Sequence, residues 1–118
     1  MLDTSLLASI ATQMMSGNSV DVNGKPVPVS RTSKNRFRTL AFTMEGRGYQ
    51  AIEQNAEKPS RWGQLAREGH KVVQFKDWAT NRFVAVVLMG RSRWRQRGKL
   101  RSLGLAVAPA TEVGDNPD

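Results

Sequence analysis

The chain has 118 residues, a net charge of +8 and no cysteine. This length predicts one domain with a modest core, and the absence of cysteine excludes disulfides, thiolate metal sites and cysteine nucleophiles. The 39% apolar and 24% charged residues indicate a small folded domain with some disordered sequence attached. The strong positive charge indicates an acidic partner. Nucleic acid is the commonest such partner of a small basic domain, and an anionic membrane or an acidic protein comes next.

The N-terminal segment does not have the pattern of a signal peptide. Asp3 lies near its start, and neither Lys nor Arg precedes the apolar stretch. The longest apolar run, residues 83–89, is much shorter than the roughly 20 residues that cross a bilayer. We therefore expect a cytoplasmic protein without a membrane span.

The first predicted element is an amphipathic helix that Asp3 caps and Gly17 ends. Its apolar residues recur at helical spacing on one side: Leu6, Leu7, Ile10, Ala11 and Met14. A helix of this length is not stable alone, so it must pack on the core or on a second chain.

A β-hairpin and a strand pair are predicted next. Asn23-Gly24 favours a type I′ turn between residues 20–22 and 27–29, and two prolines make the second arm an edge strand at best. Residues 37–44 form the next predicted strand. Gly46-Arg47-Gly48 is expected to break it by a turn or bulge before residues 49–54 pair back.

The second half of the domain begins with a short helix over residues 61–68. Ser60 can cap it, Trp62, Leu65 and Ala66 share its apolar side, and Gly69 ends it. Residues 71–75 form a strand, residues 77–81 a connection, and residues 83–89 a strand that is apolar on both faces. Such a strand is typical of the centre of a sheet that is covered on both sides.

A basic segment with a period of two follows residue 90. In an extended chain, alternate side chains share a face, whereas a helix would scatter them. The predicted nucleic-acid-binding residues are its cations and the tryptophan among them: Arg91, Arg93, Trp94, Arg95, Arg97, Lys99 and Arg101. Each arginine can bind a phosphate in a bidentate manner, and Trp94 can stack on an unpaired base.

Two other interpretations of the basic segment stay open. It can be a solvated extension that keeps the protein soluble, or an arm attracted to anionic lipid at about 1 kcal/mol per basic residue. The segment lacks the flanking apolar helix that usually accompanies lipid binding. A second basic group consists of Arg31, Lys34, Arg36 and Arg38. We interpret it as charge that protects an edge strand from pairing with other molecules, rather than as a continuation of the same positive surface.

Outside the basic groups, few residues are candidates for binding or catalysis. Trp62 is expected in the core, while Trp78 lies in a connection and is the better candidate for an exposed stacking platform. His70 follows a helix end, where it is expected to interact with the last carbonyls, and no nucleophile or second acid is placed beside it by spacing. We therefore predict no catalytic residues, no metal site and no cofactor.

These observations predict an α+β single domain. An N-terminal helix, an antiparallel sheet of four to six short strands and one short inserted helix occupy residues 1–90, and a basic extended arm with a disordered tail occupies residues 91–118. The expected function is a non-enzymatic, sequence-tolerant nucleic-acid-binding accessory protein. The alternative is a protein-interaction or regulatory module whose N-terminal helix is the docking surface. The oligomeric state stays open.

Overall fold

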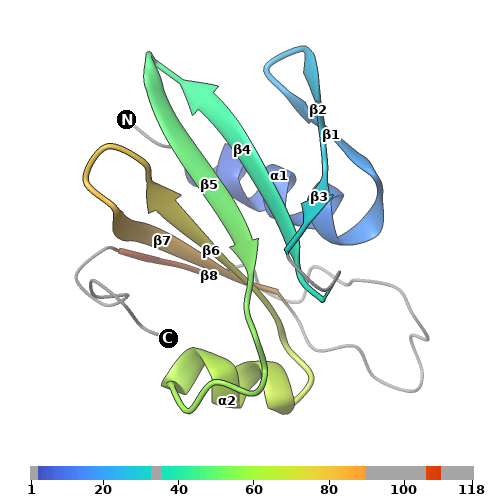
Figure 1. The fold of residues 1–118 in the computed structure, drawn as a ribbon, viewed down its shortest axis with the longest axis vertical. Coiled ribbons are helices and arrows are strands. Elements are labelled where there is room, and N and C mark those ends of the chain that lie inside the picture. Colours follow the sequence, from blue (N-terminus) through green and yellow to red (C-terminus); the bar gives the residue numbers. More distant parts are fainter. Residues whose placement is uncertain (1–2, 33–35, 90–105, 110–118) are drawn as a thin grey trace.

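The computed structural model describes residues 3–32, 36–89 and 106–109 of the chain. Helix α1 precedes strands β1 to β5 in the chain, and helix α2 precedes strands β6 to β8 (Figure 1). Their order and bounds are α1 (Thr4–Ser16), β1 (Ser19–Val22), β2 (Lys25–Pro28), β3 (Ser30–Arg31), β4 (Arg38–Met44), β5 (Arg47–Glu53), α2 (Arg61–Arg67), β6 (Lys71–Asp77), β7 (Arg82–Met89) and β8 (Ala106–Pro109). The predicted α+β class is confirmed.

The main sheet is antiparallel throughout, with strand order β3-β4-β5-β6-β7-β8. Strands β1 and β2 form a separate two-stranded sheet. Each strand of the main sheet pairs with the next one in the chain, so short turns join β4 to β5 and β6 to β7, whereas the connection from β5 to β6 contains α2. The predicted sheet of four to six strands is confirmed. So is the central position of residues 83–89, since β7 lies between β6 and β8.

Helix α1 begins and packs as predicted. The Asp3 carboxylate accepts a hydrogen bond from the amide of Ser5 at 2.9 Å, which satisfies one of the free donors at a helix start. Leu7, Ile10 and Met14 are buried, while Leu6 is partly buried against the same core. The helix contacts both β4 and β7, which are three places apart in the sheet, so the sheet curves around it.

The first hairpin has the predicted turn. Asn23 and Gly24 have φ values of 51° and 84°, as a type I′ turn requires. In the β4–β5 hairpin the turn lies earlier than predicted, because Glu45 and Gly46 have φ values of 52° and 77°. A two-residue connection therefore suffices, and Gly48 lies inside β5 opposite Thr43 instead of in the turn.

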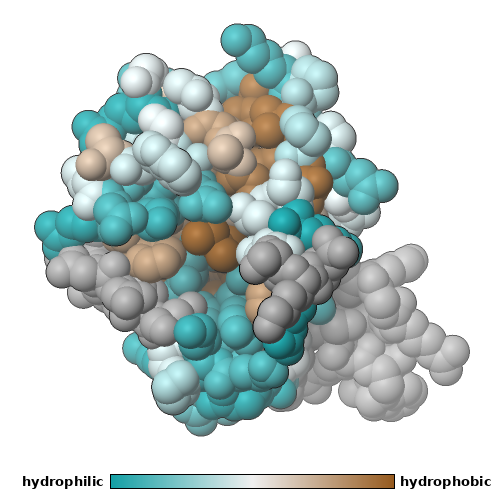
Figure 2. Space-filling view, viewed as in Figure 1, coloured by the Kyte–Doolittle hydropathy of each residue, from teal (hydrophilic) through white to brown (hydrophobic). Residues whose placement is uncertain are grey.

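The two faces of the main sheet are covered differently. The inner face packs on α1 and includes Leu40, Phe42 and Phe75. On the outer face α2 packs on β6, with Trp62 buried against Val72 and Val86. In Figure 1, α1 lies behind β4 and β5, so the viewer looks at the part of the outer face that α2 leaves free. Figure 2 shows apolar surface beside β4, surrounded by hydrophilic surface.

Strand β8 lies beyond the predicted domain boundary at residue 90. It pairs antiparallel with β7, and Ala106 lies opposite Leu88. The predicted arm and tail, residues 91–118, thus include a strand of the sheet, Ala106–Pro109. No helix in the described part of the chain is both long and apolar enough to cross a membrane.

Candidate nucleic-acid interface

The predicted binding residues of the basic segment, Arg91, Arg93, Trp94, Arg95, Arg97, Lys99 and Arg101, lie outside the described residues. The structure describes the strands on both sides of this segment. Met89 ends β7 and Ala106 begins β8, and these strands are neighbours in the sheet. Residues 90–105 thus connect two paired strands, and the role of their cations stays a prediction.

Trp78 is the exposed large hydrophobic side chain of the described part of the chain. It follows directly after β6 and is 64% exposed. Tryptophan is highly buried on average in folded proteins. The prediction that Trp78 is exposed and Trp62 is buried is confirmed.

The backbone around Trp78 is held by hydrogen bonds. Its amide donates to the carbonyl of Gly48 in β5 at 2.9 Å. The carboxylate of Asp77 accepts from the amides of Ala79 and Thr80 at 2.9 Å and 3.4 Å, and the amide of Asn81 donates to the Asp77 carbonyl at 2.8 Å. The exposed indole therefore stands on a structured turn.

An ion pair connects this turn to the start of β5. Nη2 of Arg47 lies 2.5 Å from Oδ2 of Asp77, whose side chain is only 8% exposed. Burial opposes ionisation of Asp77. Hydrogen bonds from Arg47 and from the amides of Thr80 and Ala79 outweigh it, so the pKa of Asp77 lies below its ordinary value. The same hydrogen bond and charge raise the pKa of Arg47.

A second cation lies beside the indole. Nζ of Lys76 is 5.9 Å from the centroid of the Trp78 ring, within the range of a cation–π interaction. The Arg47 side chain is 53% exposed although it pairs with Asp77. Positive charge and an exposed aromatic ring thus occur together at the β6–β7 turn.

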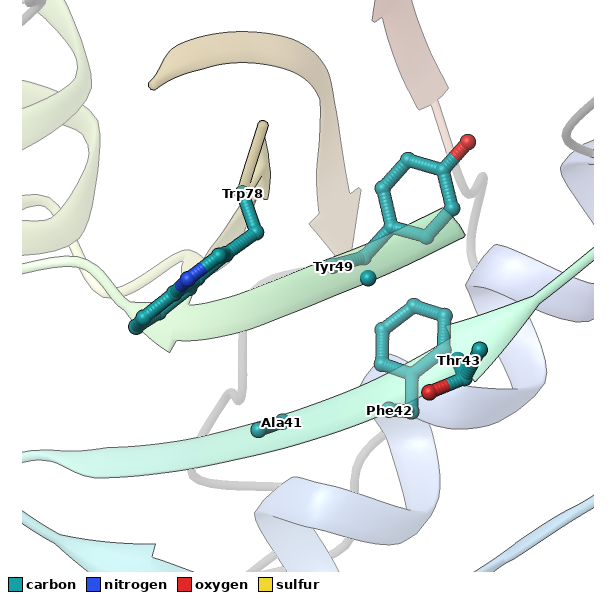
Figure 3. A pocket seen from close by; sticks show the side chains of 6 residues that line it. Ala41, Phe42, Thr43, Tyr49 and Trp78 are labelled. Atoms are coloured by element: carbon teal, nitrogen blue, oxygen red, sulfur yellow. The ribbon is translucent and has the colours of Figure 1, made fainter. Parts of the chain in front are cut away.

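A shallow hollow of about 220 Å³ opens next to Trp78 (Figure 3). The figure shows the indole on one side of the hollow and Ala41 and Thr43 of β4 on the other. Cross-strand register explains the space, because Thr43 lies opposite Gly48 and opposite residues share a face. Small side chains therefore occupy the outer face where the indole lies. The lining residues are Ala41, Phe42, Thr43, Gly48, Tyr49 and Trp78.

Comparisons of this chain with protein-family models, curated proteins and solved structures find no match.

The residues of the second basic group have different surroundings in the structure. Arg36 pairs with both carboxylate oxygens of Glu57, at 3.1 Å and 3.0 Å, so its charge is compensated. Arg31 in β3 lies opposite Arg38 in β4, at the edge of the main sheet, and Lys34 lies outside the described residues. An edge position is where cations protect against strand pairing between molecules.

The imidazole of His70 contacts a different carbonyl from those predicted, although the His70 amide donates to the carbonyl of Leu65 in α2 at 3.1 Å. Its Nδ1 lies 3.4 Å from the carbonyl oxygen of Met89 at the end of β7 rather than at the end of α2. It lines a second hollow of about 180 Å³ together with Glu53, Gln54 and Lys71. Among the described residues, no three histidine, cysteine or acidic side chains gather where they could hold a metal ion.

Sequence reasoning did not identify Lys76 or the small side chains of the hollow. One signal was present for Lys76, because residues two apart in an extended segment share a face and Lys76 precedes Trp78 by two. For Ala41, Thr43 and Gly48 no such signal exists, since their proximity to Trp78 depends on strand pairing.

Proposed function

We propose that this chain is a non-enzymatic, sequence-tolerant nucleic-acid-binding accessory protein. The observation that carries the proposal is the exposed indole of Trp78 on a hydrogen-bonded turn, with the ammonium of Lys76 5.9 Å from its ring centroid. Every base has a π face on which such a ring can stack, and a nearby cation can meet the adjoining phosphate. Neither contact reads the edge of a base, so the expected binding tolerates sequence.

The basic segment follows directly after β7 in the sequence. Strand β7 runs from Arg82, after the Trp78 turn, to Met89, where residues 90–105 begin. At about 3.3 Å per residue, its ends are about 23 Å apart. A duplex that reaches both ends then spans about seven base pairs, at about 3.4 Å each.

The protein-interaction alternative has less support on α1. The apolar side chains that were candidates for a docking surface, Ile10 and Met14 among them, pack on the chain's own sheet. A partner at α1 would have to bind its polar outer side, which carries Ser5, Ser9 and Gln13.

The proposal is tested by titrating the full chain with a single strand and a duplex of about 12 nucleotides at increasing salt. We expect affinity that falls with salt for both. Trp78→Ala is expected to weaken single-strand binding by about 1–3 kcal/mol because a stacking surface is lost. Lys76→Gln is expected to weaken binding and to flatten the salt dependence.

Lys25→Gln is the matched control, because Lys25 is an exposed cation on the separate β1–β2 hairpin and the change in charge is the same. It is expected to affect binding less than Lys76→Gln. The proposal fails if the full chain shows no salt-dependent binding, or if Trp78→Ala binds single strands as tightly as the unmodified chain.

A further inference from the structure

We infer that the hollow beside Trp78 receives one unpaired base, so that the substrate class is single-stranded nucleic acid. This inference rests on the proposed function and makes it more specific. It concerns a single surface of the outer sheet face: the exposed indole, the small side chains of β4 and β5, and the cation of β6.

The register of three strands places these groups together. Ala41 of β4 lies opposite Gln50 of β5, which in turn lies opposite Lys76 of β6. Opposite residues share a face, so this row crosses the outer face with Lys76 at one end and Ala41 at the other. Trp78 lies beyond Lys76 and next to Gly48, because a Cβ atom on Gly48 would lie 3.6 Å from Cβ of Trp78.

Small residues leave room at the position where the indole could stack. Ala41 and Thr43 are exposed and Gly48 has no side chain, so the hollow of about 220 Å³ borders the indole. A flat ring that enters it can contact the indole on one side and the strands on the other. The Thr43 side chain lies at the hollow (Figure 3), and its hydroxyl can donate to or accept from a base.

An unpaired base fits this site better than a base pair does. Stacking requires access to the face of a base, and in a duplex the neighbouring bases cover both faces. A duplex presents only its phosphates and groove edges to a side chain on a sheet. The cations can contact either form, but the hollow adds affinity only for a strand whose bases are free.

The charge beside the hollow favours a nucleotide over an apolar protein segment. Nζ of Lys76 lies 5.9 Å from the centroid of the indole ring, at cation–π distance. An apolar partner would cover Lys76 without giving it an anion, and burial of an unpaired charge is unfavourable. A nucleotide brings its own phosphate to that position.

The test fills the hollow without changing charge. Ala41→Leu places a larger side chain on the exposed face of β4 and leaves Trp78 and Lys76 in place. We expect about tenfold weaker binding of a single strand of about 12 nucleotides, with unchanged binding of the matching duplex and an unchanged salt dependence. Ala8→Leu, the same change on the outer side of α1, is the control and is expected to bind single strands normally.

A spectroscopic measurement follows the indole itself. In a Trp94→Phe chain the remaining tryptophans are the buried Trp62 and the exposed Trp78. A single strand is expected to quench the fluorescence of Trp78, whereas a duplex is not. Ala41→Leu should remove most of this quenching, and circular dichroism of each variant checks that it is folded.

The outcomes separate this inference from the proposed function. If Ala41→Leu and Ala8→Leu bind single strands equally well, or if duplex binding falls as much as single-strand binding, the hollow does not hold an unpaired base. Salt-dependent binding of both nucleic acids would still support the proposed function in that case. If the unmodified chain binds neither nucleic acid, the proposed function and this inference both fail.

Discussion

Arg47 and Asp77 form an ion pair that joins the start of β5 to the end of β6. Nη2 of Arg47 lies 2.5 Å from Oδ2 of Asp77, and the other carboxylate oxygen accepts hydrogen bonds from the amides of Ala79 and Thr80. One buried carboxylate thus connects two strands and orders the turn that begins with Trp78. The position of the exposed indole depends on this carboxylate.

The ion pair predicts a specific dependence of stability on pH. The folded-state pKa of Asp77 is lowered, so its contribution to the free energy of unfolding is fully present above the unfolded value of about 3.9. This contribution is lost as the pH falls below about 3.9 and through the lower folded-state pKa. Asp77→Asn should be less stable at neutral pH and should lose less stability on acidification.

Urea denaturation at a series of pH values between neutral and strongly acidic measures this difference. Arg47→Gln removes the hydrogen bond from Arg47 to Asp77 and keeps the carboxylate. The pH dependence of its free energy of unfolding should therefore fall between those of the unmodified chain and Asp77→Asn. Identical acid profiles for the unmodified chain and Asp77→Asn would contradict the prediction.

Gly63 is predicted to be the glycine at which alanine is least tolerated among those with a defined environment. A Cβ atom there would lie 2.1 Å from the carbonyl oxygen of Lys58, so helix α2 could not approach the preceding loop. Gly63→Ala should lower the free energy of unfolding by about 1–3 kcal/mol, although alanine favours helices. Gly48→Ala is the control, because its Cβ would make an ordinary 3.6 Å contact. Equal stability of both variants in thermal melting would contradict the prediction.

The buried side of α1 predicts a large effect of charge at Ile10. Ile10 is fully buried between the helix and the sheet, and an unpaired carboxylate there cannot be solvated. Ile10→Asp should destabilise the fold by several kcal/mol, whereas Ser9→Asp on the exposed side of the helix should have little effect. Thermal melting of both variants measures the difference, and an unchanged melting curve for Ile10→Asp would show that α1 is peripheral.

The basic segment predicts the size of the salt dependence. If Arg91, Arg93, Arg95, Arg97, Lys99 and Arg101 each neutralise one phosphate, log K against log salt should have a slope of about −5 on duplex and about −4 on single strands. Arg95→Gln should flatten the duplex slope by about one, while Arg95→Lys keeps the charge and should preserve it. Substitutions are preferable to truncation after Gly90, because truncation would also remove β8.

If both Arg95 variants keep the full slope, or if the unmodified chain has a slope near zero, the segment does not neutralise phosphates. It would then act as a solvated extension that keeps the protein soluble.

Local elements of the fold could be predicted from short stretches of sequence. Asp3 and Ser60 accept hydrogen bonds from amides near the start of α1 and α2, and Asn23-Gly24 adopts the positive φ values of the first turn. Each of these features depends on residues within a few positions of one another, so composition and spacing suffice. The turn after β4 was misplaced because Glu45, which is not a residue that favours positive φ, adopts it.

The helices, most of the strands and the basic character of the chain could be predicted without the fold, because hydrophobic periodicity, caps and charge are local properties. The face of the sheet that α1 covers and the pairing of β8 with β7 could not be predicted in this way, and neither could the proximity of Ala41, Gly48 and Trp78. These residues come from three segments, and their proximity follows from strand register. A shift of register by one residue would turn each side chain to the opposite face.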